Sequence, residues 1–392
     1  MTVAVKDTNV DDVLDVFSVF LRSQRHLRKH PLLVVGAGVS KGEIPLLADI
    51  GSWLARRLRT DDLSPKLGWL VEHSEDLARG RASRRQVAEL FTCLQSAEPI
   101  SSGLSAVWNE FSRALLIDGF EIDGQSFSGI SSARARETHR RIASEIRDMR
   151  CWTVSLNFDG LIYQALRWPE VSSNFPGLSL HSEVEFEHYF CSRAEQSIPA
   201  VFNIRGDVFY ATCTQPLCPR AVQPYPIADD SPTRGLDPGT EPELPDSDRL
   251  ALTFEEKSQD GSNALSCNLC GGGTLSLQFS FPGLRAKEEL AFPLLWKLRR
   301  FLGPSISAIV VIGLSGMWDR YLLQFLFDLS SERRIPVLDI KPEYPSQNPI
   351  ETFRAAHFPS IYSRGLGSVQ PESTFTFVST TAEHALPILF SK

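Results

Sequence analysis

The sequence lacks the marks of membrane, disulfide-rich and nucleic-acid-binding proteins. Its longest apolar runs, 32–35 and 308–314, fall far short of the roughly 20 residues that a membrane-spanning helix needs. Seven cysteines in 392 residues are an odd number and a low density, which disfavours a disulfide framework. The 40 Lys and Arg are outnumbered by 47 Asp and Glu, so the net charge of −7 attracts neither nucleic acid nor an anionic membrane. We therefore expect no membrane contact and no direct nucleic-acid contact.

The composition is otherwise that of a soluble globular protein, with 42% hydrophobic and 22% charged residues. Residues 1–10 lack the basic region and the apolar core of a secretory signal. Few, partly clustered thiols suit a reducing compartment, where such clusters bind metal. We expect a cytoplasmic protein.

Apolar runs of strand length alternate with helical patterns along most of the chain. We predict helices at 11–27, 50–58, 138–149, 161–166, 287–301, 320–329 and 381–389, and strands at 32–35, 152–156, 200–204, 308–312 and 335–340. Strands that alternate with helices predict an α/β fold with a parallel sheet covered on both faces.

The first strand runs into Gly36-Ala37-Gly38-Val39-Ser40. Two glycines after a buried strand let backbone N–H groups approach a pyrophosphate closely. The usual G-x-G-x-x-G pattern would need Gly at position 41, which is Lys41. A strand-to-helix turn in any α/β protein can also require two glycines, and that alternative stays open.

Four cysteines form two close pairs, which is the strongest signal from spacing alone. Cys213 and Cys218 have four residues between them, and Cys267 and Cys270 have two. Such pairs are typical of a structural zinc site with four sulfur ligands. The 48 residues between the pairs include segment 221–260, which has six prolines and ten acidic residues against three basic ones. That composition predicts a solvated surface insertion. Four unliganded thiols are the alternative.

Asn157 and Asp159 follow the second predicted strand directly, at the end where open α/β sheets bind ligands. The alternative for this polar pair is to cap the next helix.

Taken in order, these features resemble the sirtuin-type NAD-binding domain. Six motifs between residues 32 and 389 carry the resemblance: Gly36–Ser40, Gly42–Pro45, Ser155–Asp159, Ile204–Asp207, Gly313–Ser315 and Ile340–Glu343. Segments 46–150 and 221–262 lie outside it. The resemblance implies that NAD is bound as substrate or ligand by Gly36, Ala37, Gly38, Ser40, Asn157, Asp159, Gly313, Ser315 and Lys341.

The resemblance also divides the chain into regions. They are an N-terminal helix (1–30), a Rossmann-like NAD-binding domain (31–45, 151–212 and 273–392), a helical insertion (46–150), and a zinc module with the acidic Pro-rich insertion (213–272). The fold class that we predict is α/β, a Rossmann-like parallel sheet with a large helical insertion and a small zinc-binding module.

Departures from the family pattern bear on which of three functions the chain has: deacylation, NAD hydrolysis or ligand binding without turnover. Arg205 stands where the family has its catalytic His, and an arginine stays protonated and cannot serve as a general base. Deacylation is therefore the weakest of the three. His181 and His188 lie upstream of Arg205, and for each a surface position is the better prediction.

Bacterial sirtuin-like proteins with large helical insertions resemble the chain more than lysine deacylases do. That branch implies NAD hydrolysis to nicotinamide and ADP-ribose in antiphage defence, with Asn157, Asp159 and Arg205 as catalytic candidates. It also implies a homo-oligomer or a partner protein bound through the insertion. The alternative is a catalytically degenerate subunit that binds NAD or ADP-ribose, or is architectural.

Overall fold

A computed structural model describes most of the strands and helices of the chain. The described residues are 3–4, 10–57, 76, 90, 107, 110, 111, 113–129, 133–157, 159–166, 178–180, 183–192, 198–213, 215–218, 225–226, 270, 275–279, 285–314, 322, 325–326, 328–330, 335–342 and 375–391.

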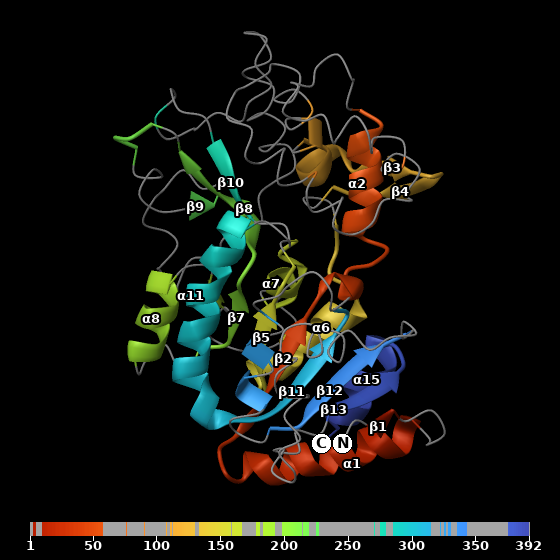
Figure 1. The fold of residues 1–392 in the computed structure, drawn as a ribbon, viewed down its shortest axis with the longest axis vertical. Coiled ribbons are helices and arrows are strands. Elements are labelled where there is room, and N and C mark those ends of the chain that lie inside the picture. Colours follow the sequence, from red (N-terminus) through yellow and green to blue (C-terminus); the bar gives the residue numbers. More distant parts are fainter. Residues whose placement is uncertain are drawn as a thin grey trace, which may run out of the picture.

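An eight-stranded parallel sheet forms the centre of the molecule (Figure 1). Its strands, in spatial order, are β1 (Val3–Ala4), β13 (Phe375–Ser379), β12 (Val337–Lys341), β11 (Ile306–Ile312), β2 (His30–Val35), β5 (Trp152–Ser155), β7 (Ala200–Asn203) and β6 (Leu178–Leu180). From β2, the sheet continues through β5 and β7 on one side. From β11, it continues through β12 and β13 on the other side. The strand order therefore reverses between β2 and β11.

Helices cover both faces of this sheet, which confirms the predicted α/β class. On one face α1 (Val10–Arg25), α6 (Glu137–Arg147), α7 (Leu161–Leu166) and α15 (Ala382–Leu389) share a core with Leu33, Val35 and Val310. On the other face α8 (Glu183–Cys191) and α11 (Arg285–Leu302) share a core with Leu32 and Val34. Figure 1 shows α8 and α11 beside one another on their side of the sheet.

Burial on both faces explains why β2 and β11 are continuous apolar runs. Residues 31–35 of β2 and all seven residues of β11 are buried. The two strands pair in register up to Val35 and Ile312, so their carboxyl ends lie side by side. Strands covered by helices on both faces are mostly apolar at successive positions, and the alternation of a half-exposed strand is lost.

The segment predicted as a helical insertion contains more than helices. It includes α2 (Leu47–Ala55), a short π-helix η4 (Ala114–Asp118) and an antiparallel hairpin of β3 (Phe120–Ile122) and β4 (Gln125–Phe127). Its last helix, α6, packs on the central sheet through Ile142, Ala143 and Ile146. The part of the insertion that stands apart from the sheet therefore ends before α6.

A second, three-stranded sheet lies beyond the carboxyl end of β7, at the top of the view in Figure 1. It consists of β10 (Leu275–Phe279), β8 (Gly206–Cys213) and β9 (Tyr225–Pro226), all antiparallel. Two 3-10 helices complete the described elements, η1 (Ala37–Val39) after β2 and η8 (Gly303–Ser305) before β11. Among the described helices, none has the length and apolar character of a membrane span.

Candidate functional site

The carboxyl ends of β2 and β11 form the point where the strand order reverses. In open α/β sheets such a switch point opens a crevice, because the connections from the two strands leave in opposite directions. The loops that follow the two strands meet there: the N–H of Gly36 donates to the carbonyl of Ile312 at 2.8 Å, and that of Gly38 donates to Gly313 at 2.9 Å. The sequence-predicted Gly36–Ser40 loop thus begins at the switch point.

Contact between the two loops requires glycine at three positions. A Cβ at Gly36 would lie 2.6 Å from the carbonyl oxygen of Gly313, and one at Gly38 would lie 2.9 Å from the Gly313 Cα. Gly313 itself has φ +68°, where a side chain is strained. The glycines are therefore needed for loop packing, while the tip of the loop, Ala37 and Gly38, is exposed and accessible to a ligand.

Three buried polar side chains converge at the end of this loop. Ser40 follows η1, His139 lies in the first turn of α6, and Asn157 follows β5. The Asn157 Nδ2 donates to the Ser40 Oγ at 3.0 Å, and the His139 Nε2 lies 3.2 Å from the same oxygen. The exposed fractions of Ser40, His139 and Asn157 are 2%, 0% and 4%, respectively. Segments far apart in the sequence therefore meet at one hydroxyl group.

The side-chain oxygen of Asn157 is buried and has no hydrogen-bond partner among the residues that the structure describes. The residue is held in place by its own backbone N–H, which donates to the Ser155 Oγ at 3.1 Å. Next to it, the Leu156 N–H donates to the carbonyl of Val35 at 2.9 Å, which ties the end of β5 to the end of β2. A buried acceptor left without a donor costs about 1–3 kcal/mol. A ligand that donated to Asn157 would recover this energy.

Asp159 caps α7, as the alternative interpretation of the sequence allowed. Its Oδ1 accepts the N–H of Leu161 at 3.0 Å, and the carboxylate is 4% exposed. Its charge also acts on His139. Burial lowers the pKa of His139 below the usual value of 6.5, and the negative charge of Asp159 opposes that effect.

Arg205 and Lys341 are both buried at the carboxyl edge of the sheet. Arg205, 2% exposed, lies in the turn between β7 and β8, where the Ile204 N–H donates to the carbonyl of Ser155 at 3.2 Å. Lys341 ends β12, and its Nζ lies 2.8 Å from the Oδ2 of Asp339. Burial raises the pKa of Asp339, and Lys341 acts in the opposite direction. The lysine charge is therefore partly neutralised by a carboxylate on its own strand.

Some predicted residues lie outside the described part of the chain, namely Ser315, Cys267 and His181. The neighbouring Gly313 and Leu314 are described, as are the other three cysteines. His188 is exposed on α8, which is the surface position predicted for it.

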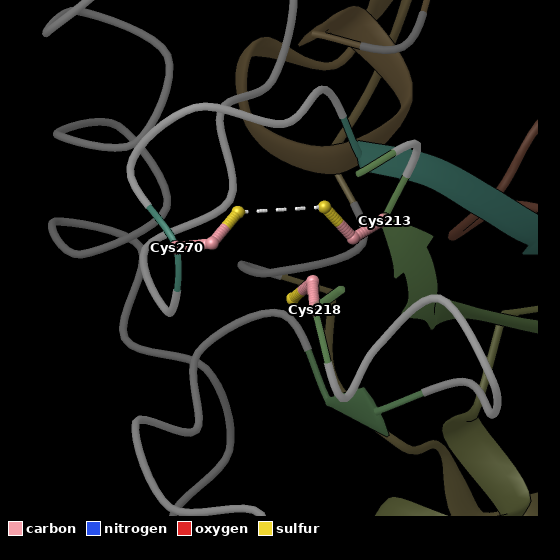
Figure 2. Close-up of side chains that lie close together, drawn as sticks. All are labelled: Cys213, Cys218 and Cys270. Carbon is pink, nitrogen blue, oxygen red and sulfur yellow. Dashed lines mark hydrogen bonds between the residues drawn. The ribbon is translucent and has the colours of Figure 1, made fainter. Parts of the chain in front are cut away.

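Three of the four predicted zinc ligands lie close together at one end of the three-stranded sheet. Figure 2 shows Cys213 and Cys270 pointing toward one another, with Cys218 beside them. The sulfur atoms of Cys213 and Cys270 are 3.6 Å apart, and all three sulfur atoms lie within 4.8 Å of one another. A disulfide would need about 2.05 Å. Two sulfur ligands at about 2.3 Å from a tetrahedral zinc lie about 3.8 Å apart, so the geometry fits zinc.

Further contacts support a metal centre at these cysteines. The backbone N–H of Gln215 donates to the Cys213 sulfur at 3.4 Å, a contact of the kind that stabilises a metal-bound thiolate. Cys213 also pairs with Leu275, so the centre is anchored where β8 meets β10. Zinc bound by thiolates would be structural there, because it would hold the strands that follow Arg205 to β10.

Comparison with known proteins yields a similar structure and no similar sequence. The structure is described as "Sir2 bound to acetylated peptide". It is 10% identical to this chain, the match covers 88% of this chain and 99% of that one, and the TM-score is 0.35. No family model matches the sequence, and none of the curated proteins matches it. The function is therefore inferred from the geometry of the crevice.

Sequence reasoning missed two residues of this region, His139 and Asp339. His139 occupies a predicted helix in which a single histidine carries no spacing signal. Asp339 could have been found, because residues two apart in a strand share a face and Lys341 follows it at that interval.

Proposed function

We propose that the protein binds NAD in the crevice between β2 and β11 and hydrolyses the bond between nicotinamide and ribose. The observation that carries this proposal is the unpartnered side-chain oxygen of Asn157, buried at the switch point of the sheet. Dinucleotides bind at such switch points, with their phosphates near the glycine-rich first loop. The exposed tip of Gly36–Ser40 supplies that loop here.

The reaction consumes one water and needs no oxidant or reductant. The bond between the nicotinamide nitrogen and the ribose C1′ breaks, and its electron pair leaves with the nitrogen, so the positively charged ring becomes neutral nicotinamide. The oxygen of water forms the new bond to C1′, and a proton is released to solvent. The transition state carries positive charge on the ribose, and fixed dipoles directed at that charge lower its energy.

The side chains of this chain would divide that work. Asn157 would accept a hydrogen bond from the attacking water or from a ribose hydroxyl and so orient it. The Asp159 carboxylate would favour the positive charge that develops on the ribose. Arg205 would pair with a phosphate of NAD, since a guanidinium binds phosphate and does not take up protons. Zinc would supply only structural support at the neighbouring sheet.

The test is to incubate the purified protein with NAD at high enzyme concentration and to measure nicotinamide and ADP-ribose by chromatography. We expect release by the wild type and a loss of about 100-fold or more in Asn157→Ala, the usual cost of removing one oriented polar group from a transition state. Circular dichroism and the melting temperature report on folding in the same samples.

Asn203→Ala is the matched control. Asn203 is also a buried asparagine at the carboxyl end of a strand, but its Nδ2 is paired with the Ser179 Oγ at 2.6 Å. This variant should lose stability and keep its rate of NAD cleavage. Cleavage that survives Asn157→Ala would contradict the site assignment.

A second candidate function is supported by Arg205. Its burial at the place of the expected catalytic histidine favours a subunit that binds NAD or ADP-ribose without turnover. Calorimetric binding of both ligands with no release of nicotinamide would support it. Arg205→His would then create cleavage in an inactive parent, whereas an active wild type would exclude this candidate. Deacylation remains the weakest proposal, since it needs the missing histidine.

The antiphage role and assembly through the helical insertion also remain part of the proposal. They follow from the sequence resemblance, and a mass measurement by light scattering tests the assembly directly.

A further inference from the structure

The surroundings of His139 determine which of its two ring nitrogens carries the proton and donates a hydrogen bond. It is the third residue of α6 and is fully buried. The backbone N–H of Arg136 donates to its Nδ1 at 3.0 Å. A ring nitrogen that accepts a hydrogen bond carries no proton, so the proton of the neutral ring lies on Nε2. The ring therefore presents a donor at Nε2.

The Nε2 donor determines what the Ser40 hydroxyl can do. Nε2 lies 3.2 Å from the Ser40 Oγ, and the Asn157 Nδ2 donates to the same oxygen at 3.0 Å. Two donors occupy both lone pairs of a hydroxyl oxygen. The Ser40 O–H therefore cannot donate to either neighbour, and its proton points in a third direction.

The Asn157 amide complements this arrangement. Because its Nδ2 faces Ser40, its Oδ1 faces away from Ser40, and this is the buried oxygen that has no partner. Ser40 and Asn157 thus present a donor and an acceptor on two buried side chains joined by a hydrogen bond.

We propose that His139 is a positioning residue that fixes Ser40 as a donor and Asn157 as an acceptor, so that together they bind a hydroxyl group. A hydroxyl, whether of water or of a ribose, accepts from Ser40 and donates to Asn157 at once. A phosphate oxygen only accepts, so the Asn157 oxygen would repel it. The proposal rests on the proposed function only for the identity of the ligand.

Burial of His139 favours the neutral ring and so supports this polarity. Asp159, Arg136, Glu43 and Glu383 all act on the ring, and burial outweighs them and lowers its pKa. Glu43 and Glu383 are themselves engaged: Arg136 pairs with Glu43, and the Thr138 hydroxyl donates to Glu383 at 2.7 Å. The first turn of α6 is thereby held to the loop after Ser40 and to α15.

The first measurement requires no NAD. In protein labelled with ¹⁵N-histidine, the two ring nitrogens of His139 should show the neutral Nε2–H form at pH 7–8, assigned by the signal missing from His139→Gln. His188, exposed on α8, supplies a second assigned signal in the same spectrum. A protonated Nδ1 or a charged ring in this range would overturn the proposal.

The second measurement compares two substitutions at His139. Glutamine can place an amide N–H near the Nε2 position and leucine cannot, so NAD cleavage should fall less than about 10-fold in His139→Gln and about 100-fold in His139→Leu. His188→Leu is the control and should match the wild type. Equal rates in the Gln and Leu variants, both folded by circular dichroism, would overturn the donor role.

An NAD analogue that lacks one hydroxyl of the nicotinamide ribose distinguishes the two hydroxyl sources. If Ser40 and Asn157 bind that ribose hydroxyl, the analogue binds more weakly than NAD to the wild type, and His139→Leu binds the two equally. If they bind water, both proteins bind the analogue and NAD alike, and only cleavage falls in His139→Leu. Tighter binding of inorganic phosphate than of ribose at this pair would overturn the proposal. Absence of NAD binding with the Nε2–H ring intact would contradict only the proposed function.

Discussion

A methyl group at position 36 would meet the backbone of the opposite loop. A Cβ there would lie 2.6 Å from the Gly313 oxygen, too close for any real contact, and a backbone atom cannot turn away as a side chain can. We expect Gly36→Ala to lower the free energy of unfolding by about 1–3 kcal/mol, the usual cost of overpacking. The two loops would separate, so NAD affinity should fall about 10-fold or more in calorimetry.

Gly303→Ala is the matched control for this prediction. A Cβ at Gly303 would have only the Leu329 Cδ2 nearby, at an ordinary contact distance of 3.8 Å. Urea unfolding and NAD binding of this variant should match those of the wild type. Equal losses in both variants would show that the crevice does not depend on the contact between its loops.

His139 also makes stability depend on pH. Its pKa in the folded protein is below the 6.5 of the unfolded chain, so the unfolded chain binds the proton more readily. The stabilisation is present above about pH 6.5 and is lost as pH falls toward the lowered pKa. The unfolding free energy should therefore decrease from pH 7 to pH 5.5.

Burial also lowers the pKa of His30, so His139 is not the sole source of this pH dependence. Comparing the wild type with a His139 variant isolates the contribution of His139. The loss between pH 7 and pH 5.5 should be smaller in His139→Gln than in the wild type, by urea unfolding at each pH. Identical pH dependence in the two proteins would contradict a lowered pKa at His139.

The sequence predicts site residues where they have a positional signal. Glycines after an apolar run and a polar pair after the next run mark strand ends, and strand ends in a parallel sheet meet at one edge. His139 has no such signal, because its partners Ser40 and Asn157 come from other segments and only the packing of α6 on the sheet brings them together. The spacing of the cysteines likewise predicted a cluster, and the structure brings Cys213, Cys218 and Cys270 together.

At the scale of elements, the cysteine cluster lies where β8 and β10 meet. Cys213 is the last residue of β8 and faces Leu275, the first of β10. We expect about one zinc per chain by metal analysis and a fall of about 5 °C or more in melting temperature when a chelator removes it, because zinc that binds only the folded state stabilises that state.

Substitution of single cysteines tests the ligand set. Cys218→Ser and Cys267→Ser should each lower the zinc content and the melting temperature, whereas Cys191→Ser, at an exposed thiol on α8, should change neither. Full zinc content in Cys267→Ser would exclude the fourth ligand that the spacing predicts.

Strands were predictable where burial on both faces produces a continuous apolar run. β2 and β11 have such runs and β7 has a shorter one, whereas Asp339 interrupts β12 and Thr153 interrupts β5. β6 has three residues, and β13 includes the polar Thr376 and Ser379 and lies next to the edge strand, so neither forms a long apolar run. Short and edge strands owe their existence to a neighbouring strand that is already in place.

At the scale of the whole molecule, the groups of the proposed reaction all lie at the carboxyl ends of the parallel strands. The glycine loops, Asn157, Arg205 and Lys341 all follow or end parallel strands, and parallel strands place their carboxyl ends on the same side. Helices cover both faces of the sheet, so a ligand would contact the loops at the carboxyl ends of the strands. The three-stranded sheet continues from it through β8.

The pairing of β2 with β11 also determines when the crevice is assembled. Gly36 and Gly313 lie 277 positions apart in the chain, yet each supplies part of the same loop contact. During synthesis, Gly36 leaves the ribosome long before its partner exists, so a nascent chain shorter than 313 residues has no complete crevice. Closing so long a stretch of chain lowers its entropy before the loop contact forms, and this slows folding. A ligand that binds between these loops would therefore meet only chains whose synthesis and folding are nearly finished.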